Sequence, residues 1–333
     1  MPTDIRTTAA TMVRSGAGIL AADESIATCS QRLTALGIEA TEESRRRWRE
    51  VLLGTPGLEE HVSGVILFDE TFRQADGDGT PFPQLLATRG ILPGIKVDTG
   101  AKPLAGAEDE TITEGLDGLR DRIGAYVDLG ARFAKWRAVF RIGSGLPSGN
   151  AVHANAHSLA RYAALCQEGG LVPIVEPEVL MAGDHVMQRC AEVTSGVLAA
   201  VFEELFRASV DLRGIVLKPS MVLPGSGAAP VSPQTVASRT VECLRDTVPA
   251  SVAGIAFLSG GQGAALATTH LGLMNADGPH PWPLTFSYGR AIQDDVLKTW
   301  LGSDDNVDRA RSILLDRVRD NGQATLGRVP DAA

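Results

Sequence analysis

Two lysines and a glutamate lie in three successive apolar segments of this sequence. Lys135 lies in FAKWRAVF, Glu176 in LVPIVEPE and Lys218 in GIVLKPSM. If these segments are neighbouring strands about 4.8 Å apart, Glu176 lies between the two lysines. A like charge and partial burial both lower the pKa of a lysine, and the neutral amine can attack a carbonyl carbon. The glutamate can move protons while the resulting carbinolamine forms and breaks down. A structural salt bridge explains one lysine beside one glutamate, but not the second lysine.

Charged residues also stand at the ends of other apolar segments. Asp23 ends the first segment, and Lys96 and Asp98 end the third. Residues two apart on a strand share a face, so Lys135 and Glu176 each have a same-face partner, namely Arg137 and Glu178. Any one of these charges alone could be a solvated strand end. As a set they must be paired or functional, because charges in apolar strands are costly.

An anion-binding signature occurs near the end of the sequence. The segment FLSGGQG contains Ser259, Gly260 and Gly261, and Arg290 follows SYG. Glycines let backbone N–H groups close on an anion, and an arginine can bind phosphate through two hydrogen bonds. An isolated SGG is usually a turn, but its position beside Arg290 favours a phosphate cradle. Several cations on an acidic protein indicate a phosphorylated substrate.

The elements that must position these residues recur along the chain. Short apolar segments, typical of strands buried on both faces, are separated by segments with helical periodicity. They begin at Gly18, Gly64, Ile91, Phe133, Leu171, Gly214, Gly254 and Pro283. Eight strand–helix units are the number that closes a TIM (β/α)8 barrel, in which the active site lies at the carboxyl ends of the strands. An open, doubly wound sheet is the alternative, and the even spacing favours the barrel.

No linker divides the chain, so we expect one α/β domain over residues 1–333, with an N-terminal helix and a short C-terminal helix and tail. Thr41 and Ser232 are of the residue types that begin helices, and Pro233 suits a first helical position. The charge run Arg45–Arg47 is interpreted as a solvated helix face.

Composition excludes several classes of protein. The 333 residues include 31 Lys and Arg against 40 Asp and Glu, a net charge of −9, which argues against a nucleic-acid partner. No apolar run approaches the ~18 residues of a membrane helix, and the first residues do not have the pattern of a signal peptide. The four cysteines are far apart and form no CxxC pair, which is typical of reduced thiols. We therefore expect a cytoplasmic enzyme.

The sequence offers little for a metal. His153 and His157 are four residues apart and could share a helix face, a spacing that zinc sites use. No third ligand is evident nearby, and the other four histidines (His61, His185, His270 and His280) are scattered. We expect no metal and no other cofactor.

The sequence resembles the class I fructose-bisphosphate aldolases along nearly its whole length. The shared strings include AADES, TEESRR, GVILFDE, GIKVD, FAKWR, VPIVEPE, LKPSM, FLSGGQ and LTFSYGRA, in this order. The resemblance implies a (β/α)8 barrel, no metal, a homo-oligomer that is usually a tetramer, and reversible cleavage of fructose 1,6-bisphosphate. The products are dihydroxyacetone phosphate and glyceraldehyde 3-phosphate.

The resemblance also implies roles for individual residues. Lys218 matches the Schiff-base lysine, Glu176 the acid of carbinolamine dehydration, and Lys135 the second active-site lysine. Asp23 matches the carboxylate that acts at the C3–C4 bond and the 4-hydroxyl. Residues matching the C1 phosphate site are Ser259, Gly260 and Arg290. Residues matching the region of the C6 phosphate are Lys96, Ser25 and Arg32, with Thr28 where the family usually has serine.

The end of the chain departs from the animal enzymes. Those enzymes finish with a tyrosine that assists proton exchange, whereas the last tyrosine here is Tyr288. Water, Glu176 or Glu178 must then protonate the enamine. Alternatives remain open: a Schiff-base lyase preferring fructose 1-phosphate or sedoheptulose 1,7-bisphosphate, or a non-catalytic scaffold that keeps the barrel. A zinc-dependent aldolase is disfavoured because there is no histidine cluster.

Overall fold

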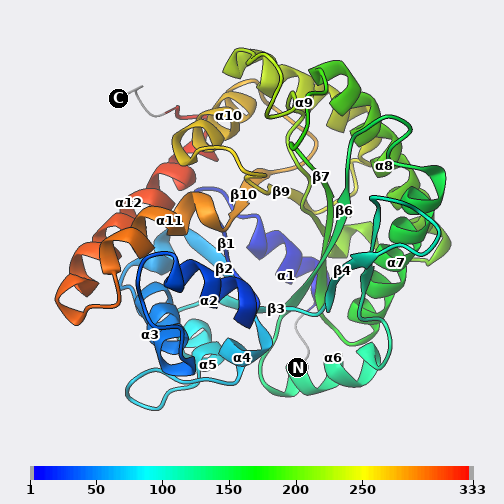
Figure 1. The fold of residues 1–333 in the computed structure, drawn as a ribbon. Helices are drawn as coiled ribbons and strands as arrows, with labels where there is room; N and C mark the ends of the chain where they lie inside the picture. Colours follow the sequence, from blue (N-terminus) through cyan, green and yellow to red (C-terminus); the bar gives the residue numbers. More distant parts are fainter. Residues whose placement is uncertain (1–3, 330–333) are drawn as a thin grey trace.

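A closed ring of eight parallel strands forms the centre of the molecule (Figure 1). The structure, a computed structural model, describes residues 4–329. Around the barrel the order of strands is β1-β10-β9-β8-β7-β6-β3-β2. The bounds are β1 Gly18–Ala22, β2 Val62–Leu67, β3 Leu92–Lys96, β6 Phe133–Phe140, β7 Val172–Val179, β8 Val216–Leu217, β9 Gly254–Phe257 and β10 Leu284–Tyr288. The barrel prediction is therefore confirmed, and the open sheet is wrong.

The predicted strand ends are less accurate than the strands themselves. Asp23 follows β1, Asp98 lies two residues beyond β3, and Lys218 follows β8 rather than ending it. The phosphate-cradle residue Ser259 likewise lies beyond β9. The N–H of Lys218 still donates to Val175 O at 2.8 Å, but the next residue is Pro219, which has no N–H to donate.

Helices other than α1 surround the barrel as an outer layer (Figure 1). The helix bounds are α1 Ile5–Met12, α2 Ile26–Thr34, α3 Glu42–Leu53, α4 Asp69–Phe72, α5 Phe82–Thr88, α6 Leu119–Asp128, α7 Gly149–Glu168, α8 Met187–Arg207, α9 Pro233–Thr247, α10 Ala264–Ala276, α11 Arg290–Trp300 and α12 Val307–Ala324. Both predicted helix starts are confirmed. The Thr41 side chain accepts from the N–H of Ser44, and the Ser232 side chain accepts from that of Thr235.

The solvated-face interpretation of the arginine run is wrong for its first member. Arg45 is buried and pairs with Glu70, with Nη2 2.6 Å from Oε1. Arg46 pairs with two acidic residues of its own helix. Successive residues of a helix point about 100° apart, so a run of three cannot share one face. The first arginine therefore points inward from α3.

The amino-terminal end of the barrel is filled by α1. Ala9, Met12 and Val13 pack with the inward-facing apolar residues of the strands, and the Ser63 hydroxyl donates to Met12 O at 2.6 Å. In the view of Figure 1, α1 lies within the outline of the ring of strands. The barrel is thus closed at this end, and the carboxyl ends of the strands form the accessible mouth.

The aromatic ring of Phe133 fills the barrel interior beside two glycines, one in β2 and one in β3. A Cβ atom built on Gly94 would lie 2.1 Å from the Phe133 ring, and one on Gly64 would lie 2.9 Å from it. The aromatic ring occupies the volume that side chains would need at these positions. Glycine in β2 and β3 is therefore a packing requirement.

One element was not predicted. β4 Gly100–Pro103 and β5 Thr111–Glu114 form an antiparallel hairpin after β3, beside the mouth. The first residue of the hairpin, Gly100, donates its N–H to Asp98 Oδ1 at 3.1 Å. Asp98 in turn pairs with Lys96. The hairpin therefore helps to fix the carboxylate beside Lys96.

Among residues 4–329, none of the helices combines the length and apolar character that a bilayer span requires. All four cysteines are buried and free of disulfides.

Candidate active site

A cavity of about 680 Å³ opens at the carboxyl ends of the barrel strands. It contains thirteen of the fourteen residues predicted from the sequence as catalytic or substrate-binding. These are Asp23, Ser25, Thr28, Arg32, Lys96, Lys135, Arg137, Glu176, Glu178, Lys218, Ser259, Gly260 and Arg290. Gly261 does not line this cavity, and lines an adjoining one of about 520 Å³ instead.

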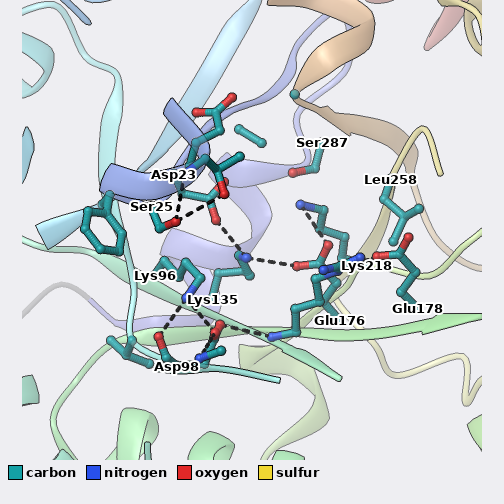
Figure 2. A pocket seen from close by; sticks show the side chains of 18 of the residues that line it. Asp23, Ser25, Lys96, Asp98, Lys135, Glu176, Glu178, Lys218, Leu258 and Ser287 are labelled. Carbon is teal, nitrogen blue, oxygen red and sulfur yellow. Dashed lines mark hydrogen bonds and ion pairs between the residues drawn. The ribbon is translucent and has the colours of Figure 1, made fainter. Parts of the chain in front are cut away.

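The two lysines flank Glu176 as expected (Figure 2). Lys135 Nζ lies 3.4 Å from Glu176 Oε2, and Lys218 Nζ lies 3.2 Å from Glu176 Oε1. Lys135 Nζ also lies 2.7 Å from Asp23 Oδ2. The register of β6, β7 and β8 brings these residues together from three adjacent strands. Both lysines and Glu176 are only 3% exposed, so their charges interact with little screening by water.

Charge pairing shifts the pKa of two groups at this site, Lys135 and Asp23. Burial by itself lowers the pKa of Lys135, but the carboxylates of Asp23 and Glu176 outweigh burial and raise that pKa above its ordinary value. Burial raises the pKa of Asp23, but Lys135, Lys218 and Lys96 outweigh it and lower that pKa to about 2. The expectation that a lysine of the pair has a lowered pKa is therefore wrong for Lys135. This lysine is a fixed cation.

Unpaired donors gather on the other side of Lys218. Gly260 and Gly261 have φ of +59° and +91°, backbone that favours glycine. Within residues 4–329, their two N–H groups have no acceptor, and the Arg290 guanidinium has no hydrogen-bond or ion-pair partner. Arg290 is also the first residue of α11, whose N-terminal end carries partial positive charge. This group of donors matches an anion such as phosphate.

The opposite rim of the cavity carries paired cations. Lys96 Nζ lies 2.5 Å from Asp98 Oδ1, and Arg137 pairs with Glu178. The Glu178 carboxylate raises the pKa of Arg137, against the opposing effect of burial. All four residues line the cavity.

The start of α2 supplies small hydroxyl groups to the same rim. Ser25 caps this helix, and its Oγ lies 3.1 Å from Thr28 Oγ1. Arg32, one helical turn later, pairs with Glu24 and with Asp294 Oδ1 at 3.0 Å. The charge of Arg32 is therefore largely neutralised by protein carboxylates, which distinguishes it from Arg290.

Several residues of the cavity were not predicted from the sequence. Ser287 of β10 is buried, and its Oγ has no hydrogen-bond partner in the described part of the chain. Figure 2 shows it pointing toward the cavity near Lys218. Arg122 and Tyr126 of α6 also line the cavity. The sequence signal that could have identified Ser287 is a serine inside the apolar run PLTFSYGR. No sequence pattern marks the two α6 residues as part of the site.

The histidine pair of α7 has an acidic neighbour that the sequence did not reveal. His157 Nδ1 lies 2.9 Å from Glu204 Oε2, and His153 Nδ1 lies 3.9 Å from Glu204 Oε1. Arg207 also pairs with Glu204. Across residues 4–329, no group of three or more His, Cys, Asp and Glu side chains has the arrangement of a metal site.

Comparison with known proteins decides the family. The profile of the glycolytic class-I fructose-bisphosphate aldolases matches residues 4–333. This chain belongs to the class I fructose-bisphosphate aldolases. A probable class 1 fructose-bisphosphate aldolase from Xanthomonas campestris pv. campestris is 54% identical over 325 residues, covering 96% of this chain and 97% of that one. The cytosolic fructose-bisphosphate aldolase 6 of Arabidopsis thaliana is 53% identical over 313 residues, covering 94% and 87%.

A solved aldolase structure has the same fold. The fructose-bisphosphate aldolase of Plasmodium falciparum, solved with TRAP and a small-molecule inhibitor, superposes with a TM-score of 0.97 at 47% identity. The comparison covers 98% of this chain and 95% of that aldolase. The fold, the family and the lyase class predicted from the sequence are thus confirmed.

Proposed function

We propose that this aldolase cleaves fructose 1,6-bisphosphate through an imine formed on Lys218, without a metal or other cofactor. The observation that carries the proposal is Glu176, whose two carboxylate oxygens face Lys218 and Lys135. One catalytic domain over residues 1–333 performs the whole reaction.

Imine formation begins with transfer of a proton from the Lys218 ammonium to Glu176, 3.2 Å away. The free electron pair of Nζ then attacks the C2 carbonyl carbon, and a proton passes from the nitrogen to the carbonyl oxygen to give the carbinolamine. Glu176 protonates the resulting hydroxyl, which leaves as water, and the iminium ion forms. Lys135 stays protonated and stabilises the negative charge that develops nearby.

Bond cleavage follows at the carboxylate of Asp23. With its pKa lowered to about 2, Asp23 is ionised and accepts the proton of the C4 hydroxyl. The C3–C4 bond breaks, and its electron pair moves to the iminium nitrogen and gives an enamine. The aldehyde is released, a proton adds to C3, and water hydrolyses the imine. Water or one of the acids Glu176 and Glu178 supplies the proton at C3.

The two phosphates fit the two ends of the cavity. The C1 phosphate takes the free N–H groups of Gly260 and Gly261, the Ser259 hydroxyl and Arg290. The C6 phosphate takes the rim formed by Lys96, Arg137, Ser25, Thr28 and Arg32. Unpaired donors at the first end and Lys96 beside Asp98 at the second support this orientation.

Borohydride reduction in the presence of dihydroxyacetone phosphate, followed by peptide mapping, tests the imine. The reduced adduct is expected on Lys218, and Lys218→Met is expected to abolish it. Lys135→Met is the comparison variant, because it should slow the reaction and still leave the adduct on Lys218. An adduct on another residue, or none, contradicts the proposal. Activity lost to EDTA and restored by zinc would contradict the metal-free mechanism.

The proposal also covers the preferred substrate, the oligomeric state and the cellular location of the protein. Comparing kcat/KM for fructose 1,6-bisphosphate, fructose 1-phosphate and sedoheptulose 1,7-bisphosphate separates the leading substrate from the alternatives. We also propose a cytoplasmic homo-oligomer, a tetramer by family resemblance. The four free cysteines and the cytosolic plant relatives support the location. Sedimentation analysis tests the oligomer.

A further inference from the structure

The turn that presents the free N–H groups is braced by one glutamine. Gln262 directly follows the glycine pair, and its backbone N–H donates to Ser259 O at 3.0 Å. Its side-chain Nε2 donates to the same carbonyl oxygen at 3.0 Å. Both donors of one residue therefore hold the first carbonyl of the turn, and this restricts the backbone between them.

A buried histidine of α10 fixes the orientation of that glutamine. His270 Nδ1 lies 2.6 Å from Gln262 Oε1, and His270 is 1% exposed. Because Nε2 of the glutamine donates to Ser259, Oε1 must be the acceptor and His270 Nδ1 the donor. Burial lowers the pKa of His270 to about 4, so the ring is neutral near pH 7 and its proton is on Nδ1.

The same amide also contacts the loop that carries Lys218. Gln262 Nε2 lies 3.5 Å from the sulfur of Met221, three residues after Lys218. Gln262 is 8% exposed, so water can hardly replace these partners. Loss of one partner leaves a buried polar group unsatisfied, and the turn must shift to recover a hydrogen bond.

We propose that His270 and Gln262 are positioning residues that hold the backbone of residues 259–261 in the conformation that receives the substrate phosphate. The proposal rests on the function proposed above. According to this proposal, the buried pair sets how tightly the phosphate group of the substrate binds. It does not affect imine formation on Lys218. Neither residue touches the reacting atoms.

Two ketones, one with and one without a phosphate group, distinguish a specific effect on phosphate binding from a general effect on folding. Borohydride trapping at increasing concentrations of dihydroxyacetone phosphate, and of dihydroxyacetone, measures imine formation with and without a phosphate. The test variants are His270→Leu and Gln262→Met, and His270→Asn keeps an amide N–H donor near the place of Nδ1. Thr268 lies on the same helix as His270, and Thr268→Val is the matched control, because it removes a buried 3.0 Å hydrogen bond to Asn321 of α12 without touching the turn.

In His270→Leu and Gln262→Met, the half-saturating concentration of dihydroxyacetone phosphate is expected to rise about tenfold, the equivalent of one lost hydrogen bond. Trapping with dihydroxyacetone should be unchanged in both variants. His270→Asn should recover most of the loss, and Thr268→Val should behave as wild type toward both ketones despite a lower denaturation midpoint.

Equal losses with both ketones, or no loss with the phosphate ester, would overturn the proposal. So would a Thr268→Val variant that shows the same selective loss. If His270→Leu does not fold, Gln262→Met alone decides by the same criteria. A wild-type chain that traps neither ketone contradicts the imine on Lys218. Calorimetry with inorganic phosphate then decides the positioning proposal separately, with weaker binding expected for both variants and equal binding contradicting it.

Discussion

Glu176 contacts both active-site lysines, and each of its oxygens faces a different cation. In the proposed mechanism, a single carboxylate takes a proton from Lys218 and returns it to the carbinolamine without moving far. General acid–base help of this kind accelerates a step by roughly 10²–10⁴-fold.

Glu176→Gln is expected to lower kcat by roughly 10²–10⁴-fold, because the amide cannot exchange this proton. Steady-state turnover of fructose 1,6-bisphosphate measures it. Glu110→Gln is the matched control, since Glu110 is also buried but accepts from the Ser148 N–H outside the cavity. A Glu176→Gln variant with turnover within about threefold of the control would show that another group carries the proton.

The pairing of Asp23 with Lys135 should make stability depend on pH. The pKa of Asp23 is lowered to about 2, below the ~3.9 of an unfolded aspartate. The pair therefore stabilises the fold fully above about pH 4, and this contribution is lost as the pH falls toward 2. The difference in denaturation midpoint between wild type and Asp23→Asn should shrink over that interval. A difference that stays constant between pH 6 and pH 3 would contradict the pairing.

The sequence predicts functional residues well where a charged residue occurs in an apolar strand segment. Lys135, Glu176 and Lys218 are of this kind, because a buried charge has few explanations other than pairing or function. Ser287, Gln262 and His270 were not recognised, because serine and glutamine are ordinary near loops and a lone histidine is usually a packed core residue. The direction of the Lys135 pKa depended on Asp23 being 2.7 Å away, a distance set only by the fold.

At the scale of elements, the barrel interior depends on close packing between β3 and β6. A Cβ on Gly94 would lie 2.1 Å from the Phe133 ring, far inside van der Waals contact. Gly94→Ala is expected to destabilise the fold by roughly 1–3 kcal/mol, the usual cost of overpacking. Denaturant unfolding measures this. Gly124→Ala is the control, because Gly124 lies within α6 with open space around its Cβ position, and it should be neutral or stabilising.

Strands could be predicted because barrel strands are buried on both faces and read as short apolar runs. The β4–β5 hairpin escaped prediction because residues such as Lys102 and Glu114 are exposed and leave no such run. Strand ends were displaced by one or two residues for a related reason. Apolar character continues past the last residue of the strand, as at buried Leu258 after β9.

At the scale of the whole molecule, the short C-terminal tail follows α12. Arg328 and Val329 lie close to Gly272 of α10, and residues 330–333 lie outside the described residues. Deletion of the residues after Gly327 is expected to change kcat by less than about threefold, well below the general-acid range, because no phenol is lost. Turnover and proton exchange into dihydroxyacetone phosphate measure this. A hundredfold drop in exchange, with folding intact, would assign the proton to the tail.

The helix that fills the amino-terminal end of the barrel has a kinetic consequence. With α1 packed against that end, the cavity opens at the carboxyl ends of the strands, and we expect substrate, products and water to enter and leave there. Under the proposed mechanism the ketone half stays covalently on Lys218 until water hydrolyses the imine, so the aldehyde half leaves first and vacates the path by which water arrives. The two products should therefore dissociate in a fixed order. Dihydroxyacetone phosphate should inhibit competitively against the bisphosphate, and glyceraldehyde 3-phosphate noncompetitively. A reversal of these patterns would mean that the ketone can leave while the aldehyde remains bound.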